Sequence, residues 1–351
     1  MKIAILNLNP GVDRVIYLPA PLAPGTMNRA DRTVFSQGSK AANQAILLAR
    51  LGGAEIDFYT FTGGPLGEAC DAFTALPGIT MHTVPTAAGV RVNTKVIDAA
   101  GCATELNERG GPVTADELAL LINALRAGCG NVDILSISGS IPQGVEKTVY
   151  KSIIASGIAR RVILDCDGEQ LRLALEAGPA LIKPNRRELA GLMAAIAPGE
   201  FSADLSAPGE LIAACGKVRE KSPKTDIICT LDADGSLYVG AEGSWQVSAP
   251  AVPFRGFSGA GDTYLAAFTH ARFVRGRTVP DALRFAAAAA SAKVALEGSM
   301  LPDRDAIEGL MKEVELCSFG GKPPKRHPTR TLFEKRVLDS QKLSRIFHLN
   351  P

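Results

Sequence analysis

Short β-rich runs alternate with longer segments of helical spacing between Thr114 and Leu296. Strands that alternate with helices of this length predict a largely parallel β-sheet covered by helices on both faces. Ligands of such sheets bind beyond the carboxyl ends of the strands, so functional side chains are expected in the loops that follow them. The predicted strands are 134–138, 162–165, 181–183, 227–231 and 236–239, and the predicted helices are 114–127, 146–157, 169–177, 186–196, 208–221, 262–275 and 279–296.

The N-terminal third continues this alternation but contains two segments that depart from it. Strands are predicted at 2–8 and 56–61, and helices at 43–51 and 68–76. Segments of about 14–35 and 90–107 are rich in β-branched and turn residues and have little helical spacing. We expect these two segments to form a small sheet set apart from the main one.

The composition is that of a folded protein without an electrostatic partner for most of its length. The chain has 351 residues, 46% of them hydrophobic, and its 38 basic residues nearly balance 36 acidic ones. The length suggests one or two domains, and the apolar fraction excludes wholesale disorder. The near-zero net charge argues against nucleic acid as a partner of the body of the chain.

The C-terminal segment 317–351 differs in charge from the rest. Beyond Gly321 there are eight basic residues and only two acidic ones. We expect a basic extension that is either disordered or loosely docked, or else binds an acidic partner, a nucleic acid or a membrane surface.

The cysteines and the apolar runs predict a cytoplasmic protein with no membrane partner. The seven cysteines are odd in number and contain no CxxC pair, so neither a zinc ribbon nor a disulfide framework is indicated. We expect them to be buried thiols in a reducing compartment. The chain has no run of about 18 apolar residues, and its N-terminal apolar run is too short for a signal peptide.

The segment Arg255–Thr263 reads RGFSGAGDT and is followed at once by an apolar helix. Gly259, Ala260 and Gly261 leave backbone N–H groups unobstructed at the helix start, where the positive end of the helix dipole favours an anion. Asp262 would repel a bound phosphate, but it would suit phosphoryl transfer if it accepted the proton of an attacking hydroxyl. On local pattern alone, a glycine turn with Asp262 as a helix cap fits equally well.

Three commoner site motifs are excluded. The chain contains neither GxxxxGK[ST] nor GxGxxG, so there is no Walker loop and no dinucleotide fingerprint. The GxSxG motif also fails, because Ala260 stands where its second Gly belongs.

Two N-terminal loops suit a sugar ligand. Gln37–Asn43 offers Lys40 as a point charge and Asn43 as an amide that can bridge two hydroxyls, although a solvated helix start would look similar. Asp13, beyond the first strand, can bind hydroxyls or cap a turn. Ser138 and Gly139, after a later strand, suit close ligand approach but also plain turning.

Lys183–Glu188 follows another predicted strand. Asn185 and Glu188 have the spacing of a capping box, the structural interpretation, and their oxygens could also face a hydrated Mg²⁺, which usually keeps several waters. Arg29 and Arg91, in the two extended segments, suit an anionic substrate group such as a sugar phosphate.

Taken in order, these segments resemble the phosphofructokinase-B branch of the ribokinase-like carbohydrate kinases over about residues 1–315. The segment most specific to the family is Gly-Ala-Gly-Asp before an Ala-rich helix. Val90–Lys95 and Thr104–Asn107 further resemble the branch that includes 1-phosphofructokinase, tagatose-6-phosphate kinase and the minor 6-phosphofructokinase. The segments that carry the resemblance are Leu8–Asp13, Gly38–Asn43, Thr62–Gly67, Ser138–Pro142, Lys183–Glu188, Thr230–Gly235 and Gly259–Asp262.

The resemblance implies a three-layer αβα kinase domain at 1–316 with a small β lid, which pairs into a homodimer in many relatives. It implies transfer of a phosphoryl group from ATP, with Mg²⁺, to a ketohexose monophosphate, first of all fructose 1-phosphate to fructose 1,6-bisphosphate. The implied roles are a base at Asp262 and an anion hole at Gly259, Ala260 and Gly261; Mg²⁺ near Asn185 and Glu188; sugar phosphate at Asp13, Arg29, Gly38, Lys40, Asn43, Arg91 and Ser138; and nucleotide at Lys183, Thr230, Asp232, Gly235, Ser258 and Ser291.

This chain departs from the family pattern at two loops. The usual Gly-Gly-Lys-Gly appears as Gly38-Ser39-Lys40-Ala41, and the two added side chains are expected to crowd the loop that the sugar approaches. Asp232 replaces a Gly and puts a carboxylate near the expected nucleotide phosphates. A sugar-phosphate sensor that has lost turnover is therefore the alternative to an active kinase.

Overall fold

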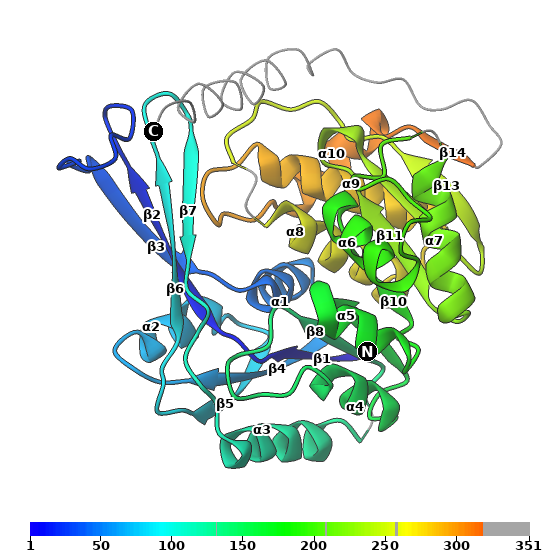
Figure 1. The fold of residues 1–351 in the computed structure, drawn as a ribbon, viewed down its shortest axis with the longest axis horizontal. Helices are drawn as coiled ribbons and strands as arrows, with labels where there is room; N and C mark the ends of the chain where they lie inside the picture. Colours follow the sequence, from blue (N-terminus) through cyan, green and yellow to red (C-terminus); the bar gives the residue numbers. More distant parts are fainter. Residues whose placement is uncertain (131, 208, 257–258, 319–351) are drawn as a thin grey trace.

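The computed structural model describes residues 1–130, 132–207, 209–256 and 259–318. Within these residues the main sheet has ten strands: β1 (Lys2–Asn7), β4 (Glu55–Thr62), β5 (Ile79–Pro85), β8 (Ile134–Ser138), β9 (Arg161–Asp165), β10 (Leu181–Ile182), β11 (Asp226–Thr230), β12 (Ser236–Gly240), β13 (Gly243–Val247) and β14 (Leu316–Ser318). Their order is β14-β13-β12-β11-β10-β9-β8-β1-β4-β5 (Figure 1). The strands from β11 to β5 are parallel, while β12, β13 and β14 add antiparallel pairs, so the predicted, largely parallel sheet is confirmed.

Helices cover both faces of this sheet and form the outer two of three layers. One face carries α3 (Ala115–Gly128), α4 (Val149–Ala155), α5 (Gly168–Leu175), α6 (Arg186–Ile196) and α7 (Glu210–Lys221). The other carries α1 (Lys40–Leu51), α8 (Ala260–Thr269), a π-helical turn (His270–Val274), α9 (Val279–Val294) and α10 (Arg304–Leu310).

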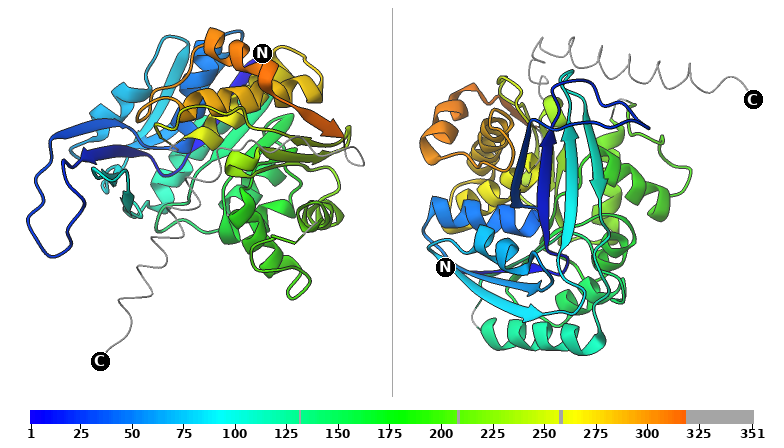
Figure 2. Two further views of the ribbon diagram at one scale, coloured as in Figure 1. Left: turned by 90° about the horizontal axis from the view of Figure 1, so that it is seen from above. Right: turned by 90° about the vertical axis from the view of Figure 1, so that its left-hand side faces the viewer.

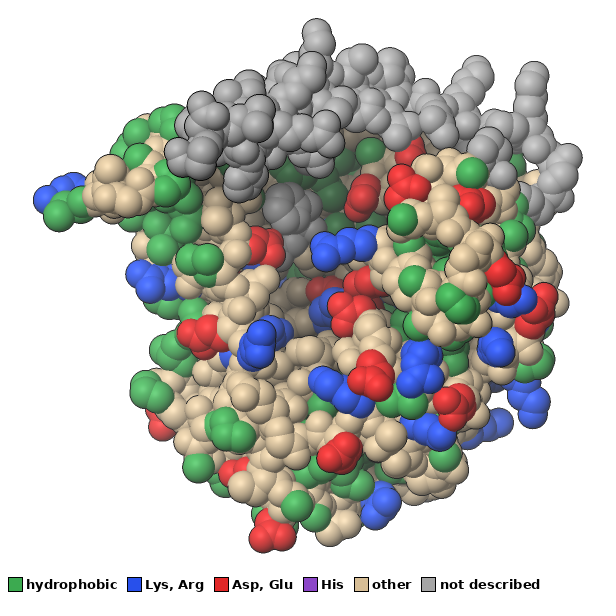
Figure 3. Space-filling model, in the orientation of Figure 1, with side chains coloured by type: hydrophobic (Ala, Val, Ile, Leu, Met, Phe, Trp, Pro, Cys, Tyr) green, Lys and Arg blue, Asp and Glu red, His purple; other side chains and the backbone are tan. Residues whose placement is uncertain are grey.

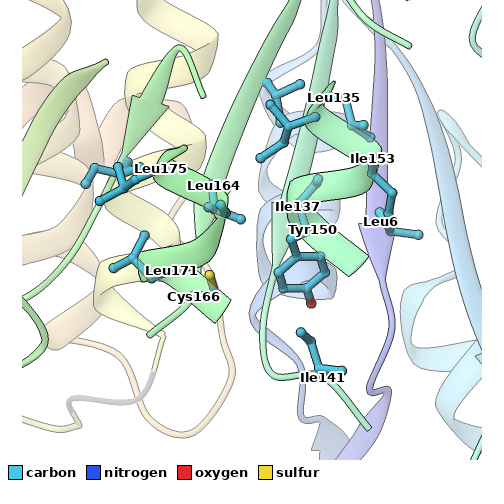
Figure 4. Packing of buried hydrophobic residues seen from close by; sticks show 14 of the residues in the cluster. Leu6, Leu135, Ile137, Ile141, Tyr150, Ile153, Leu164, Cys166, Leu171 and Leu175 are labelled. Carbon is cyan, nitrogen blue, oxygen red and sulfur yellow. The ribbon is translucent and has the colours of Figure 1, made fainter. Parts of the chain in front are cut away.

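The strand sequences explain why two helical layers are needed. Successive side chains of a strand point to opposite faces, and in β1 the side chains of Ile3 and Ile5 join one apolar cluster while Ala4 and Leu6 join the other. Both sides of the strand are therefore buried, which accounts for its continuous apolar run. Figure 4 shows Leu6 beside Ile153 and Tyr150 of α4, with Leu171 and Leu175 of α5 farther along the same apolar cluster.

A second sheet of four strands stands to one side of the main body (Figures 1 and 2). It contains β2 (Gly11–Tyr17), β3 (Arg32–Gln37), β6 (Arg91–Ile97) and β7 (Ala103–Asn107) in the order β3-β2-β6-β7, and we call it the lid sheet. Strands β2 and β6 are parallel and the outer pairs antiparallel. The two extended segments predicted from the sequence thus form the expected separate sheet. Between this sheet and the main sheet, α2 (Gly67–Thr74) contacts β3 and β4.

Several elements differ from those expected. β5, β13, β14 and α10 are additional, and the predicted helix 262–275 changes to a π-helical turn at His270. β5 mixes polar and apolar residues at the edge of the sheet and ends in Pro85, a pattern that a loop can share. Cys317 and Ser318 pair with β13 and so belong to the sheet rather than to an extension beginning at 317. The rest of the basic C-terminal segment lies outside the described residues.

The cysteine prediction is confirmed for five of the seven residues. Cys70, Cys129, Cys166, Cys215 and Cys229 are buried, Cys317 is half-buried, and all seven are free thiols. Cys102 is exposed, contrary to the prediction, because it lies at the end of the turn between β6 and β7. Among the described residues, no helix is both long and apolar enough to span a bilayer.

One buried polar cluster joins α1 to the main sheet. Gln44 donates a hydrogen bond to the Ser138 hydroxyl oxygen (2.9 Å) and accepts one from the Ser136 hydroxyl (2.8 Å). All three side chains are buried. Replacing Gln44 by Met should lower the free energy of unfolding by about 2–4 kcal/mol, because it leaves both hydroxyls without this partner in the core.

Ser138→Ala combined with Gln44→Met should cost less than the sum of the two single changes, since both remove the same hydrogen bond. Urea unfolding of the three variants measures this. Strictly additive losses would contradict the coupling.

Candidate active site

Asp262 lies in the first turn of α8, at the carboxyl edge of the main sheet. Gly259 caps this helix with a backbone φ of 80°, in the left-handed region that favours glycine. A Cβ atom at Gly259 would lie 3.1 Å from the Nδ2 atom of Asn43, so the loop also packs closely on α1. The first N–H groups of a helix have no partner within the helix. The residues 259–261 therefore present donors beside the Asp262 carboxylate.

Asp262 is buried and held by α1. Asn43 donates a 2.7 Å hydrogen bond to Oδ2 of Asp262, and Gln37 in turn donates to the side-chain oxygen of Asn43. Burial, together with the charge of Asp165, raises the pKa of Asp262 to about 6, although Lys40 and Lys183 oppose the shift. A carboxyl group with this pKa is mostly ionised at neutral pH, so it can act as a general base, while a small fraction of it stays protonated.

Two lysines and Asp165 form an ion-pair cluster beside this carboxylate. The Lys40 ammonium lies 3.1 Å from Oδ1 of Asp165, and that of Lys183 lies 3.4 Å from Oδ2. The two positive charges hold the pKa of Asp165 below its usual value in spite of its complete burial. A Cβ atom at Gly261 would lie 3.2 Å from the Lys183 ammonium, so this cation adjoins the glycine turn. The cluster thus places positive charge where an anion would meet the helix end.

Asp165 was not singled out from the sequence. It is the last residue of β9 and of the strand predicted at 162–165, so it occupies a position where functional side chains are expected. Its apolar neighbours in the sequence gave no further signal.

Asn185 and Glu188 form the capping box that is the structural interpretation of their spacing. The Glu188 N–H donates to Oδ1 of Asn185 at 2.8 Å, and the Asn185 N–H donates to Oε2 of Glu188 at 2.9 Å. The other carboxylate oxygen of Glu188, Oε1, lies 3.7 Å from the Lys40 ammonium. No cluster of three or more His, Cys, Asp or Glu side chains suited to a metal occurs among the described residues.

Asp13 lies on the lid sheet and is held by two neighbours on β6. Asn93 donates to its Oδ1 atom at 2.9 Å, and the Lys95 ammonium lies 2.7 Å from its Oδ2 atom. Gly38 packs against it so closely that a Cβ there would lie 2.5 Å from Oδ1 of Asp13. Asn93 and Lys95 belong to the Val90–Lys95 segment, but neither had been assigned a role from the sequence.

The side chains added at positions 39 and 41 do not crowd the loop. Ser39 is buried and caps α1, where its hydroxyl accepts from the Ala42 N–H at 3.1 Å and from the Asn7 amide at 3.2 Å. Ala41 is buried in the apolar cluster under α1. The expectation of crowding was wrong, because both side chains point into the protein.

Ser138 also differs from its expected place. Its side chain is completely buried and its hydroxyl is bonded to Gln44, so it does not present a group to a sugar. The preceding strand brings the residue to the correct edge of the sheet, but the side chain points into the layer beneath α1.

Arg29 and Arg91 lie at opposite ends of the lid sheet. Arg91 lies opposite Gly11, where β2 begins, and its guanidinium group donates to the backbone oxygens of Asn9 (3.4 Å) and Glu108 (3.3 Å). Arg29 is exposed in the connection between β2 and β3, at the other end. Because β2 contains seven residues, the two positions are separated by roughly 20 Å at about 3.3 Å per residue. One protein chain therefore does not bring them together on a single phosphate in this structure.

The described residues of the predicted nucleotide site come from the ends of β10 and β11, the turn before β12, and α9. Thr230 ends β11 and forms an isolated bridge with Asn185, and Gly235 has no room for a Cβ, which would lie 1.9 Å from the Val247 oxygen. Asp232, where the family has Gly, is exposed with a φ of 52°, a conformation that Asp tolerates better than most residues. Ser291 is buried in α9, and Ser258 lies outside the described residues.

The space-filling view shows a hollow between the lid sheet and the main body, with acidic and basic side chains around it (Figure 3). A buried carboxylate, a helix N-terminus and two lysines at one strand edge suit the transfer of an anionic group to a hydroxyl. This combination is what a phosphoryl-transfer enzyme with a three-layer α/β fold requires.

Comparison with known proteins agrees with this class. The model of the "pfkB family carbohydrate kinase" matches residues 6–306. The 1-phosphofructokinase of Borreliella burgdorferi is 32% identical over 303 residues, which cover 86% of this chain and 94% of that protein. The 1-phosphofructokinase of Escherichia coli is 28% identical, covering 91% and 99% of the two chains. The crystal structure of phosphofructokinase-2 from Escherichia coli with substrates and products superposes with a TM-score of 0.80 at 27% identity, covering 89% and 99%.

The chain therefore belongs to the pfkB family of carbohydrate kinases. The chain also has the ribokinase-like fold. A ribokinase from Thermotoga maritima superposes on it with a TM-score of 0.67 at 20% identity, covering 88% of this chain and 99% of that one.

Because the pKa of Asp262 is raised in the folded protein, the ionised carboxylate lowers the stability of the fold above pH 6. The folded protein binds the proton of this group more tightly than the unfolded chain, whose ordinary pKa is 3.8, so stability falls as the pH rises from about 4 to 6 and stays lower above. Asp262→Asn should therefore be more stable than the wild type by about 1–3 kcal/mol at pH 7.5.

That difference should shrink to less than about 1 kcal/mol at pH 4, where the folded carboxyl is already neutral. Urea unfolding at the two pH values measures it, with the exposed Asp31→Asn as a matched control. An Asp262→Asn variant no more stable than the wild type at pH 7.5 would contradict the raised pKa of Asp262.

Proposed function

We propose that this kinase transfers a phosphoryl group from ATP to a ketohexose monophosphate, with fructose 1-phosphate as the first candidate and fructose 1,6-bisphosphate as its product. The observation that carries the proposal is the Asp262 carboxylate, buried beside the free helix end of α8 and hydrogen-bonded to Asn43. Relatives named 1-phosphofructokinase support this substrate, and one named ATP-dependent 6-phosphofructokinase supports the donor.

The chemistry follows from the position of each group. The sugar hydroxyl donates its hydrogen bond to Asp262, and its oxygen attacks the terminal phosphorus of ATP. The new oxygen–phosphorus bond forms as the bond to the ADP oxygen breaks, and the hydroxyl proton passes to the Asp262 carboxylate. The N–H groups at 259–261 and the ammonium groups of Lys40 and Lys183 stabilise the charge on the transferring group.

Sugar binding is proposed for the lid side of the site. Asp13 accepts hydrogen bonds from the sugar hydroxyls, and Gly38 lets the sugar approach the backbone. Asn43 belongs to the loop proposed to bind the sugar and also donates a hydrogen bond to Asp262, so it aligns the sugar hydroxyl with this carboxylate. Arg91 is retained as the group that meets the existing phosphate, whereas nothing in a single chain supports Arg29 in this role.

The nucleotide is proposed to lie over the 230–235 turn and α9. Thr230, Asp232, Gly235 and Ser291 would line it, with Lys183 reaching its terminal phosphate.

The residues present fit a magnesium ion. Oε1 of Glu188 is not used by the capping box, and a Mg²⁺ ion that keeps several waters requires only one or two carboxylates. Asn185 holds Glu188 in place through the capping box. When bound, the ion would neutralise charge on the nucleotide phosphates.

The proposed assembly is a homodimer through the lid sheet. Its outer strands expose apolar side chains, with Val34 38%, Phe35 47% and Leu106 63% accessible. Such residues on the edge strands of a small sheet favour pairing with another copy. The unit proposed to act as the kinase domain is 1–318, since β14 completes the main sheet. The buried free thiols support the cytoplasmic location expected from the sequence.

The alternatives are a substrate from the same branch, tagatose 6-phosphate or fructose 6-phosphate, and a sensor without turnover. The sensor is disfavoured by the buried side chains of Ser39 and Ala41 and by the intact contact of Asn43 with Asp262. Asp232 is its remaining support.

The test is ADP release from MgATP with a panel of acceptors. The panel holds fructose 1-phosphate, tagatose 6-phosphate, fructose 6-phosphate, fructose, ribose and a nucleoside. We expect turnover on one ketohexose phosphate, a loss of about 10²–10⁴-fold in Asp262→Asn, and a decline of kcat/KM below pH 6, where the base becomes protonated.

Arg91→Met should raise the KM for the phosphorylated sugar, while Arg14→Met, an exposed arginine on the same lid sheet, should leave it unchanged. Turnover on an unphosphorylated sugar alone would contradict the role of Arg91. No turnover on any acceptor by the wild type would instead support the sensor.

A further inference from the structure

Lys293 is a completely buried lysine that the proposed reaction does not use. It lies in the last turn of α9, an Ala-rich helix whose other buried residues are small or apolar, apart from Ser291. Burying an ammonium ion is costly unless it is paired, yet no carboxylate of the described residues lies within 4 Å of this one. Its hydrogen bond is to the backbone oxygen of Gly298, at 2.6 Å. A methionine would fill the same space without that cost, so the charge calls for an explanation.

The hydrogen bond of Lys293 closes the turn that follows α9. Gly298 has a φ of 54°, and the chain between it and the helix reverses through the Leu296 N–H bond to the Lys293 oxygen, 3.0 Å. The ammonium therefore ties the far end of the turn back to the helix. It also lies in the last turn of a helix, where the dipole favours a cation.

The same turn supports the backbone that leads to residues 259–261, which we call the glycine loop. The N–H groups of Arg255 and Gly256 both donate to the Val294 oxygen, at 2.9 and 3.2 Å. A Cβ atom at Gly256 would lie 3.4 Å from the Leu296 oxygen, so these segments are in close contact. The residue bonded by Arg255 and Gly256 is thus the direct neighbour of Lys293, and Gly259 follows three residues after Gly256.

Electrostatics agrees with a charge that lies near the site. Burial lowers the pKa of Lys293 to about 8, with Lys95 on β6 acting in the same direction and Asp262 on α8 opposing it. The ammonium thus feels both the proposed base and the lysine paired with Asp13, and it is charged at neutral pH.

We propose that Lys293 is a positioning residue for the glycine loop, in which its buried cation closes the 294–298 turn and so holds the backbone that presents residues 259–262. The inference rests on the proposed function of that loop. A small shift of a helix N-terminus matters, because misplacing reacting groups by about 1 Å can cost about 10²-fold in rate.

The test compares three substitutions of Lys293 with the wild type in the full chain. Lys293→Met keeps the volume and removes the charge, Lys293→Arg keeps the charge, and Lys293→Ala leaves a space that a small cation can enter. Lys221→Met, at an exposed lysine in the last turn of α7, is the matched control.

We expect Lys293→Met to lower kcat about 10–100-fold, with the KM for the sugar phosphate changed less than about twofold and with the fold retained by circular dichroism. Lys293→Arg should keep more activity than Lys293→Met. Ammonium or potassium chloride should restore part of the activity of Lys293→Ala, whereas tetramethylammonium chloride at equal ionic strength should not, because that cation is too large for the vacated space.

Hydrogen exchange gives a readout that does not depend on turnover. The Arg255 and Gly256 amides should lose protection in Lys293→Met and keep it in Lys221→Met. Unchanged protection together with a kcat within twofold of the wild type would overturn the proposal, as would a loss in Lys293→Ala that neither small cation restores. An inactive wild type would count against the proposed function instead, while the exchange comparison would still decide the role of Lys293.

Discussion

The structure of the site depends on one balance of charge, between the buried Asp262 and Asp165 carboxylates and the ammonium groups of Lys40 and Lys183. Two carboxylates in a buried space repel each other, and this repulsion helps to raise the pKa of Asp262. The lysines offset it without forming an ion pair with Asp262 itself. Asp262 is therefore left basic enough for its proposed role as the base, and the cations remain near the helix end, where the proposed reaction holds an anionic group. Four chain segments must meet to achieve this, and the parallel sheet brings them to one edge.

Much of the fold was predictable because it follows from local patterns that tertiary contacts do not reverse. The alternation after Thr114 predicted the parallel sheet, and the two extended segments predicted the lid sheet. The glycine turn before α8 was singled out because small residues and an acidic side chain open an apolar helix, but this local pattern fitted a capped turn equally well. The family resemblance supplied the assignment as a site. Edge elements such as β5 were missed, since an amphipathic edge strand and a polar loop have similar composition.

The remaining site could not be predicted, because it depends on where side chains point. Ser138 and Asp165 both end strands at the correct edge, yet one hydroxyl is bonded within the core and the other residue's carboxylate joins the ion-pair cluster. Ser39 and Ala41 were expected to crowd the Gly38–Ala41 loop, but both side chains point into the protein at the start of α1. Arg29 and Arg91 were assigned to one phosphate by charge and by the family resemblance, and the register of β2 with β3 and β6 shows that they lie at opposite ends of the lid sheet.

The path of the chain into the lid sheet has a mechanical consequence. β1 ends at Asn7 and β2 begins at Gly11, while β3 ends at Gln37 and α1 begins at Lys40, so two of the connections between the lid sheet and the body are only three and two residues long. Asp13 belongs to the lid sheet, whereas Asp262 belongs to α8 on the body. A rotation of the lid sheet about these short connections would change the distance between the two carboxylates directly. If the sugar binds at Asp13 as proposed, its distance from Asp262 depends on the position of the lid sheet.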